Sequence, residues 1–497
     1  MSLPVHAPAG EAFDVLSRFR VEFYECLYAR ADALFELTDA VLCADGPVKT
    51  LVELSLAVEH RRGHGAMYAA LDRGWLEPAR LRRALAGLPL PRAADGRIVL
   101  AVDVSNWLRP DAPTSEDRLF CHVYGRGARS RDQFVPGWPY SFVAALETGR
   151  TSWVALLDVV RLGPANYATI VTAGQLRDVI ERLVQAQQWQ AGDPEIWIVM
   201  DSGYDVAYLS HTLADLPGVL VGRLRSDRVM LRDPGPARSG PKGGRPRRHG
   251  GVLTFAKPDS WHEPEVTTVT DTTRYGKAEA MAWDRMHPRL THRGPWLNHT
   301  KEELPILHGT LIRLKVERLP GDRDPKPVWL WCSATAATPA DVEHWWQSFL
   351  RRFDLEHTFR LMKQTLGWTA PKVRHTDTAD LWTWLIIAAH TQLRLARPLS
   401  EDLRRPWERP ARAPPTHPRP GAAGVSQRPR DHGPSSDRTE TVPARSRAAC
   451  RLEEQTPGQA PRRRQDSQTR RVDQGTPSPP TLNAKLSNWW APSSKWM

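Results

Sequence analysis

The spacing of apolar positions predicts helices in the first part of the chain. From Ala12 to Phe19, apolar residues recur at the i, i+3, i+4 and i+7 positions of an amphipathic helix. Residues 77–85 have a helical pattern as well, with basic residues on one side. We therefore expect residues 1–95 to form a helical N-terminal region.

Residues 96–224 alternate between strand and helix patterns. Residues 97–103 form an apolar run that ends in Asp103, and residues 195–201 form a similar run that ends in Asp201. The other predicted strands are 119–124, 152–160 and 219–224, and the predicted helices are 172–188 and 206–213. An acid at the end of a strand is by itself a common cap or turn residue. The order of these elements, with acids at the ends of two strands, is similar to a ribonuclease H-like α/β core.

The last part of the pattern combines a β-rich insertion with a charged helix. Residues 225–327 are rich in Pro and Gly and contain strand-like pieces at 266–269 and 311–316. A helix is predicted over 340–366, and an apolar helix over 381–395 covers it. At 100° per residue, one stripe of the first helix holds Phe349, Arg352, Glu356, Phe359 and Lys363. A stripe that faces a core is expected to be apolar because buried charge is costly, so these charges favour a functional role. An exposed Arg–Glu pair at i, i+4 is the alternative.

Composition separates the last 97 residues from the rest. Residues 401–497 hold 18 Lys and Arg, 10 Asp and Glu, and 15 of the 43 prolines, so they carry most of the net charge of +12. We expect a disordered, basic, Pro-rich tail. Two interpretations stay open, namely a native tail that touches DNA without specificity and an out-of-frame translation of GC-rich coding sequence.

Charge, cysteine content and hydropathy limit the class of protein. The positive net charge makes nucleic acid a plausible partner. The five cysteines are scattered and form no C-x-x-C motif, which excludes a disulfide scaffold or a zinc ribbon and is typical of a reducing cytoplasm. No His or Cys cluster has a spacing that favours a softer metal. We expect no membrane span, no secretory signal and a cytoplasmic, nucleoid-associated protein.

The two strand-end acids and the charged helix together resemble a known enzyme family. The spacing Arg-x3-Glu-x6-Lys of Arg352, Glu356 and Lys363 is that of the DDE transposases of bacterial insertion sequences, in the branch marked by Tyr-x2-Arg-x3-Glu-x6-Lys. Phe349 stands where this pattern has Tyr, so a ring is kept while a hydroxyl that can bond a DNA phosphate is lost. The resemblance covers roughly residues 11–400 and implies a catalytic domain over 96–400.

The resemblance implies a metal-dependent reaction at phosphorus. A DNA transposase of this kind cuts strands at the ends of its element and joins the freed 3′-hydroxyl to target DNA. Two Mg²⁺ ions, for which Mn²⁺ can substitute, would be held by Asp103, which bridges them, and by Asp201 and Glu356, which each complete one site. Arg352 and Lys363 would hold phosphates near the cut, and Phe349 would be a further DNA-binding residue.

The expected partner is DNA, both the terminal inverted repeats and the target, bound by a homodimer. In the insertion, Trp261, Trp283 and Trp296 are candidates for stacking on bases, although packing roles are the simpler interpretation. The basic loop at 241–249 contains Arg245 and Arg247 and resembles a minor-groove hook. The N-terminal helices recognise DNA ends or serve a structural or dimerising role. Two alternative functions stay open: a nuclease of the same fold that cuts without joining, and an inactive DNA-binding relic of a transposase.

Overall fold

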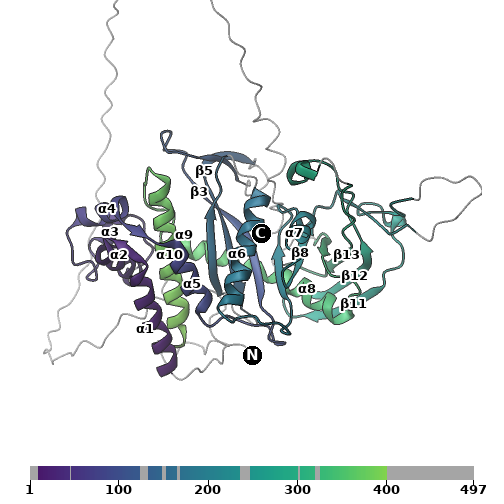
Figure 1. Cartoon of the computed structure of the whole chain (residues 1–497), viewed down its shortest axis with the longest axis horizontal. Helices are drawn as coiled ribbons and strands as arrows, with labels where there is room; N and C mark the ends of the chain where they lie inside the picture. The colour runs from purple at the N-terminus through teal and green to yellow at the C-terminus, as the bar shows by residue number, and fades with distance from the viewer. Residues whose placement is uncertain are drawn as a thin grey trace, which may run out of the picture. The chain divides into compact units, whose positions relative to one another are not determined.

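A large mixed β-sheet forms the centre of the fold (Figure 1). The computed structural model describes residues 9–399 except 45, 124–131, 148–152, 165–167, 235–246, 300–302 and 320–324. Within this part of the chain, the sheet has ten strands in the order β11-β12-β13-β14-β8-β7-β3-β5-β4, and β6 pairs with β5. The strands are β3 (Val99–Leu108), β4 (Leu119–Val123), β5 (Gln133–Leu146), β6 (Val154–Arg161), β7 (Ile196–Met200), β8 (Gly218–Leu224), β11 (Val266–Thr272), β12 (Gly276–Met286), β13 (Gly309–Val316) and β14 (Val328–Cys332).

The centre of the sheet has the strand order β6-β5-β3-β7-β8. Strands β3, β7 and β8 run parallel, whereas β5 is antiparallel to both β3 and β6. Helices α6 (Ala168–Gln185) and α7 (Val206–Thr212) connect β6, β7 and β8. This mixed α/β arrangement is consistent with the ribonuclease H-like core expected from the element order.

Side chains of alternate strand residues face opposite sides of the sheet and form two cores. On β3, Leu100 and Val102 pack in the core that also contains α6 and α7. Val99 and Ala101 face the other core, which contains three helices of the C-terminal part. These helices are α8 (Pro339–Arg351), α9 (Phe353–Gln364) and α10 (Thr376–Ala396). Asp103 follows Val99 and Ala101 in the same alternation along β3, so its side chain lies on the α8–α9 face of the sheet.

The N-terminal helices join the α10 side of this second core. They are α1 (Ala9–Glu25), α2 (Ala31–Cys43), α3 (Leu51–Leu54), α4 (His64–Arg73) and α5 (Pro78–Gly87). Figure 1 shows α1 beside α10, and the Arg20 side chain of α1 bonds Gln392 of α10 and Asp39 of α2. Phe19, Phe23 and the α10 side chains belong to the same core. The domain boundary near residue 95 stays a prediction.

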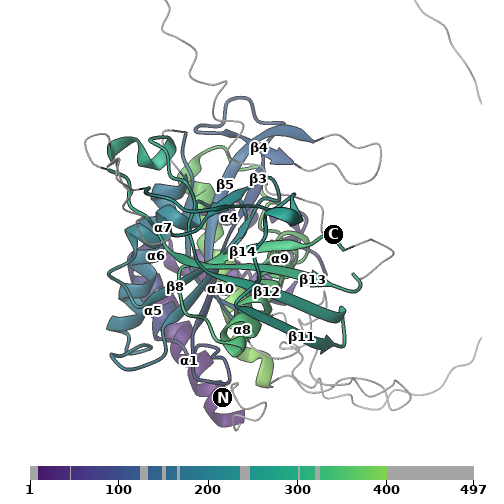
Figure 2. The same ribbon diagram turned by 90° about the vertical axis from the view of Figure 1, so that its right-hand side faces the viewer.

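The insertion between β8 and α8 extends the central sheet. Strand β14 pairs with β8, and β13, β12 and β11 follow outward, which gives the row of strands seen in Figure 2. A separate two-stranded sheet is formed by β9 (Val229–Leu231) and β10 (Val252–Thr254). The remaining short elements are β1 (Leu27–Ala29), β2 (Trp75–Leu76) and the 3₁₀ helices η1 (Pro258–Ser260), η2 (Gly294–His299) and η3 (Arg397–Leu399). The strand-like pieces at 266–269 and 311–316 are thus confirmed as β11 and β13.

Two strand predictions are wrong. The second central strand is β5, which the sequence analysis missed because Pro136, Gly137 and Pro139 break the usual strand pattern. Strand β4 pairs only with the first part of β5, at residues 133–137. The first strand does not end at Asp103, because β3 continues to Leu108 by pairing with β5. The expected tail, residues 401–497, lies outside the described residues.

Candidate active site

Asp103 and Asp201 lie at matching positions of two adjacent parallel strands. The parallel ladder between β3 and β7 ends at the pair formed by Val102 and Met200. Asp103 directly follows Val102 and Asp201 directly follows Met200, so both acids lie where the ladder stops. Asp103 is therefore within a strand but at the end of its parallel pairing. This geometry brings together two acids that are almost a hundred residues apart along the chain.

The third predicted acid comes from the helix pair above this edge. The helix expected over 340–366 is interrupted at Arg352, which separates α8 from α9. Around Arg352 the backbone hydrogen bonds join residues three apart. The Arg352 N–H donates to the Phe349 carbonyl at 3.0 Å, and the Leu355 N–H donates to the Arg352 carbonyl at 3.0 Å. The prediction of one continuous helix is therefore wrong at this position. Glu356 lies in the first turn of α9.

The guanidinium of Arg352 lies among the three predicted acids. Its Nη1 donates to Asp103, and its Nη2 lies 3.2 Å from Glu356 Oε1 and 3.7 Å from Asp201 Oδ2. Arg352 is only 3% exposed. We call Asp103, Asp201, Glu356 and Arg352 the acidic cluster. The structure thus brings together four of the residues that the sequence analysis selected.

Burial and charge determine the protonation of this cluster. Burial raises the pKa of Asp103 to about 7, with the charges of Glu356 and Asp201 adding to the shift and Arg352 opposing it. Burial also raises the pKa of Glu356, again against the effect of Arg352. Burial alone lowers the pKa of Arg352, but the three acids outweigh it and raise that pKa above its usual value. Arg352 therefore remains charged and stabilises the ionised form of its neighbours.

The donor set of the acidic cluster suits a hard divalent cation. Its three acids offer carboxylate oxygens, the ligands that Mg²⁺ prefers. A cation already lies among these oxygens in the form of the Arg352 guanidinium, which shows that the site attracts positive charge. Three carboxyl groups face the single positive charge of Arg352, so Asp103, Asp201 and Glu356 together fit a divalent ion once they have lost their protons.

Two further residues of this region were missed by the sequence analysis. Arg223 of β8 lies 3.5 Å from Asp201 Oδ1, and burial lowers the pKa of its guanidinium. Burial, followed by the charge of Asp103, raises the pKa of Tyr204 well above its usual range. No motif distinguishes either residue. Arg223 comes near the cluster from the adjacent strand β8 and Tyr204 from the loop after β7, so only the fold places them there.

The other predicted DNA contacts have different surroundings. Phe349 is 3% exposed and packs in the core, so the expectation that its ring contacts DNA does not agree with its position. Lys363 Nζ lies 5.4 Å from the ring centroid of Trp368. Arg247 is exposed, whereas Arg245 lies outside the described residues.

The three tryptophans of the insertion have packing roles. Trp283 is 1% exposed and Trp296 is 3% exposed. Trp261 packs edge to face on Trp283, with the ring centroids 6.0 Å apart. The Trp283 indole N–H donates to the His262 carbonyl at 2.8 Å. Burial and these contacts account for the positions of the tryptophan rings without a bound DNA base, in agreement with the simpler interpretation from the sequence.

Comparison with known proteins identifies the family. A family model described as DDE superfamily endonuclease matches residues 22–289, slightly more than half of the chain, and the chain belongs to this family. Asp103 and Asp201 lie inside the matched segment, and Glu356 lies after it. A search of curated proteins found no significant match. Endonucleases of this superfamily act on DNA and typically use divalent metal ions. Among the described helices, none is long and apolar enough to span a membrane.

The structure also forms a cluster that no sequence spacing indicated. Asp233, His287 and His308 each offer a ligand atom, and these atoms lie within 4.8 Å of one another. We call these three residues the histidine cluster. Within the described residues it is the one group of three or more acidic, His or Cys side chains this close together. The sequence analysis looked for metal ligands by their spacing along the chain, and these three residues come from distant parts of the insertion, so no spacing could have indicated them.

Proposed function

We propose that this chain is a DNA transposase that cuts strands at the ends of its element and joins them to target DNA. One observation carries the proposal: Asp103, Asp201 and Glu356 converge on Arg352 in a chain of the DDE endonuclease family. Three carboxylates at one edge of a sheet are the arrangement that metal-dependent phosphodiester chemistry needs.

The acidic cluster supplies the ligands for this chemistry. Asp103, Asp201 and Glu356 would hold the divalent ions, of the Mg²⁺ class. Bound there, such ions would supply charge stabilisation for an in-line displacement at phosphorus. Arg352 compensates the charge of the acids before a cation binds, and with Lys363 it offers positive charge to the phosphates of bound DNA.

DNA is the partner that the charge of the chain supports. The net charge of +12 favours a phosphate backbone, and the exposed Arg247 adds to this attraction. The N-terminal helices and the loop at 241–249 are the proposed contacts to the terminal inverted repeats. A homodimer that holds two DNA ends, in a cytoplasmic, nucleoid-associated protein, completes the proposal.

A donor-plasmid assay tests this function. The plasmid carries the DNA that flanks the gene on both sides, and the full chain is incubated with it, a target plasmid and Mg²⁺. We expect cut ends and joined products with the wild type, and neither with Glu356→Gln. The matched control is Asp354→Asn, because Asp354 is a partly buried acid on the same helix that pairs with Arg351 at 3.0 Å instead of with the cluster.

The products distinguish the possible functions. Cut ends without joined products identify a nuclease of the same fold. DNA binding without any cleavage by the wild type identifies an inactive relic. Cleavage by Glu356→Gln at the wild-type rate removes Glu356 from the site and overturns the proposed mechanism.

A further inference from the structure

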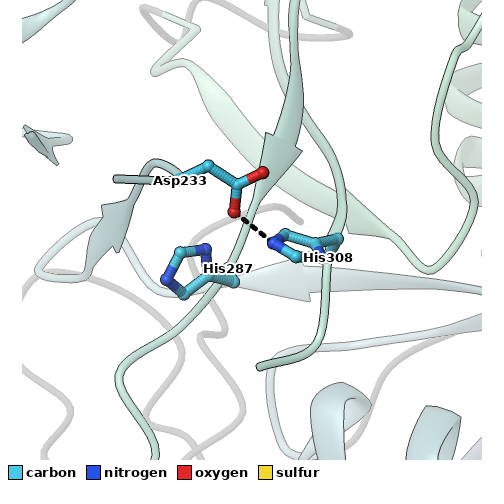
Figure 3. Close-up of side chains that lie close together, drawn as sticks. All are labelled: Asp233, His287 and His308. Carbon is cyan, nitrogen blue, oxygen red and sulfur yellow. Dashed lines mark hydrogen bonds and ion pairs between the residues drawn. The ribbon is translucent and has the colours of Figure 1, made fainter. Parts of the chain in front are cut away.

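The histidine cluster joins three separate segments of the insertion (Figure 3). Asp233 follows β9, His287 directly follows β12, and His308 directly precedes β13. The backbones of His287 and Leu231 bond each other in both directions, at 2.8 and 2.9 Å. This bridge brings the end of β12 close to the segment that carries Asp233. The three side chains therefore meet because strand pairing places their backbones together.

The backbone before His287 is bent in a way that directs this side chain. The register between β12 and β13 shifts between Trp283 and Met286, and Arg285 has a φ of 51°. A non-glycine residue in this region is uncommon and marks a bulge that redirects the next side chains. After His308, a Cβ on Gly309 would lie 2.1 Å from the Cys332 carbonyl oxygen, so β13 begins tightly against β14. Both histidines thus stand on well-positioned backbone.

His287 has one ring nitrogen that none of the described residues satisfies. The residue is 0% exposed, and its Nδ1 is buried without a hydrogen-bond partner among the described residues. Its Nε2 lies 3.0 Å from Nδ1 of His249. A buried polar atom without a partner is costly, so an acceptor that faces the cluster needs a ligand. The contact with His249 fits the tautomer in which Nε2 carries the proton and Nδ1 keeps its lone pair.

The other two residues complete a donor set. Nε2 of His308 and Oδ1 of Asp233 contact each other, and the second carboxylate oxygen accepts from Arg285 Nε at 2.8 Å. Their side chains are 26% and 35% exposed, so water can reach this side of the cluster. An ordinary ion pair explains the Asp233–His308 contact. It does not explain why His287, which has an unsatisfied buried nitrogen among the described residues, also offers a ligand atom within 4.8 Å of theirs.

We propose that Asp233, His287 and His308 form a binding site for a divalent transition metal, with Zn²⁺ as its ion. Two imidazoles and one carboxylate are a known ligand set for Zn²⁺, with a fourth position left to water. The metal replaces the direct contact between His308 and Asp233 and satisfies Nδ1 of His287. His249 then acts as the hydrogen-bond partner that orients a metal-bound histidine.

This site connects three segments of the insertion and is separate from the proposed catalytic site. Its ligands connect the end of β9, the end of β12 and the start of β13, which lie far apart along the chain. A bound ion therefore stabilises the folded insertion relative to the unfolded chain. The site uses none of the residues of the acidic cluster, so it does not depend on the proposed transposase activity.

Metal analysis of the full, tag-free chain tests the site. We expect one Zn²⁺ per chain in the purified wild type, removal of this ion by a chelator, and its return when Zn²⁺ is added. His308→Gln and Asp233→Asn should each weaken Zn²⁺ binding by more than about 100-fold, because the loss of a ligand exceeds the loss of a supporting residue. His249→Ala should weaken it by roughly 10–100-fold. Zn²⁺ should also raise the melting temperature of the wild type but not of His308→Gln.

Two controls separate this site from other metal binding. His262→Gln changes a histidine of the same insertion with similar exposure, 21% against 26% for His308, and should keep full binding. Asp103→Asn combined with Glu356→Gln should also keep it. A wild type without Zn²⁺, or equal binding by His308→Gln and His262→Gln, overturns the proposal.

X-ray absorption at the zinc edge keeps the test decisive if a variant fails to fold. In the folded wild type, the proposal requires a mixed nitrogen and oxygen shell with the outer-shell scattering of imidazole. A shell of oxygen atoms alone overturns it.

Discussion

The acidic cluster and the histidine cluster differ in how their charge is compensated. The acids at the sheet edge surround Arg352, which is 3% exposed and contacts all three carboxylates. In the insertion, Asp233 is bonded from the exposed side by Arg285, whereas Nδ1 of His287 has no partner among the described residues. One cluster already holds a protein cation, and the other has a free buried acceptor.

This difference predicts different metals for the two clusters. Carboxylate oxygens favour Mg²⁺, and an ion that binds there competes with a guanidinium. Imidazole nitrogens favour Zn²⁺ and related ions. A metal that binds Nδ1 of His287 displaces no protein cation from that nitrogen. Under the two proposals, the acidic cluster binds an exchangeable catalytic ion and the histidine cluster binds a structural ion tightly.

The largest expected effect separates the two clusters by activity. Asp201→Asn should lower Mg²⁺-dependent cleavage by at least about a thousandfold, since the acid is proposed to hold the catalytic ions. His308→Gln should leave cleavage within about threefold of the wild type. Rates on the same donor plasmid measure both variants. An equal loss in both variants would show that the two clusters act as one site.

Removal of Arg352 tests the compensating cation. Arg352→Ala leaves three neighbouring acids without their shared partner, so the free energy of unfolding in metal-free buffer should fall by about 3–5 kcal/mol. Ca²⁺ should restore part of this loss by supplying positive charge. Arg360→Ala, which changes an exposed residue of α9, should alter stability by at most about 0.5 kcal/mol. Denaturant unfolding with and without Ca²⁺ gives these values, and an unchanged stability of Arg352→Ala contradicts the role.

The pH dependence of Mg²⁺ affinity at the acidic cluster should follow the raised pKa of Asp103. Asp103, with its pKa raised to about 7, is protonated below that pH and binds a cation only after it loses the proton. Mg²⁺ affinity should therefore rise about tenfold per pH unit below pH 7 and level off above it. Titrations of Mg²⁺ in the cleavage assay between pH 6 and 8 measure this slope. In Asp103→Glu, which carries its acid on a longer side chain, the midpoint should shift, and a flat wild-type profile argues against titration of Asp103.

The smallest expected effect concerns DNA contact near the acidic cluster. Lys363→Ala should reduce the salt dependence of DNA binding by about one unit, as expected for the loss of one phosphate contact. Zn²⁺ binding by the histidine cluster should stay unchanged. Gel-shift measurements at several salt concentrations give the slope. An unchanged slope assigns Lys363 to packing on Trp368 instead.

Local patterns predicted many elements of the fold correctly. The strands at 195–201 and 219–224 appear as β7 and β8, and the helix at 172–188 appears as α6. Their apolar spacing is short-range and follows the geometry of each element. β5 was missed because its two prolines and glycine are unfavourable in an isolated strand. Pairing with β3 and β6 on either side overrides that local preference.

The candidate site was predicted only in part. Asp103, Asp201, Glu356 and Arg352 were selected from strand ends and from one motif, and the structure brings them together. Their catalytic roles stay a prediction. Phe349 was assigned to DNA but is buried, since the helix stripe on which it lies faces the core at that point.

The sequence by itself determined many of the segments that become strands or helices, although not β5, and it selected the acids of the candidate site by their positions at strand ends and by one motif. Both depend on neighbours within a few residues or on one continuous motif. Only the tertiary structure decided that Asp103 and Asp201 share one end of a parallel ladder, that Arg352 lies among three carboxylates, and that Asp233, His287 and His308 meet. These contacts join residues far apart in the chain, and they form because backbone pairing and burial place the side chains together, which no local pattern records.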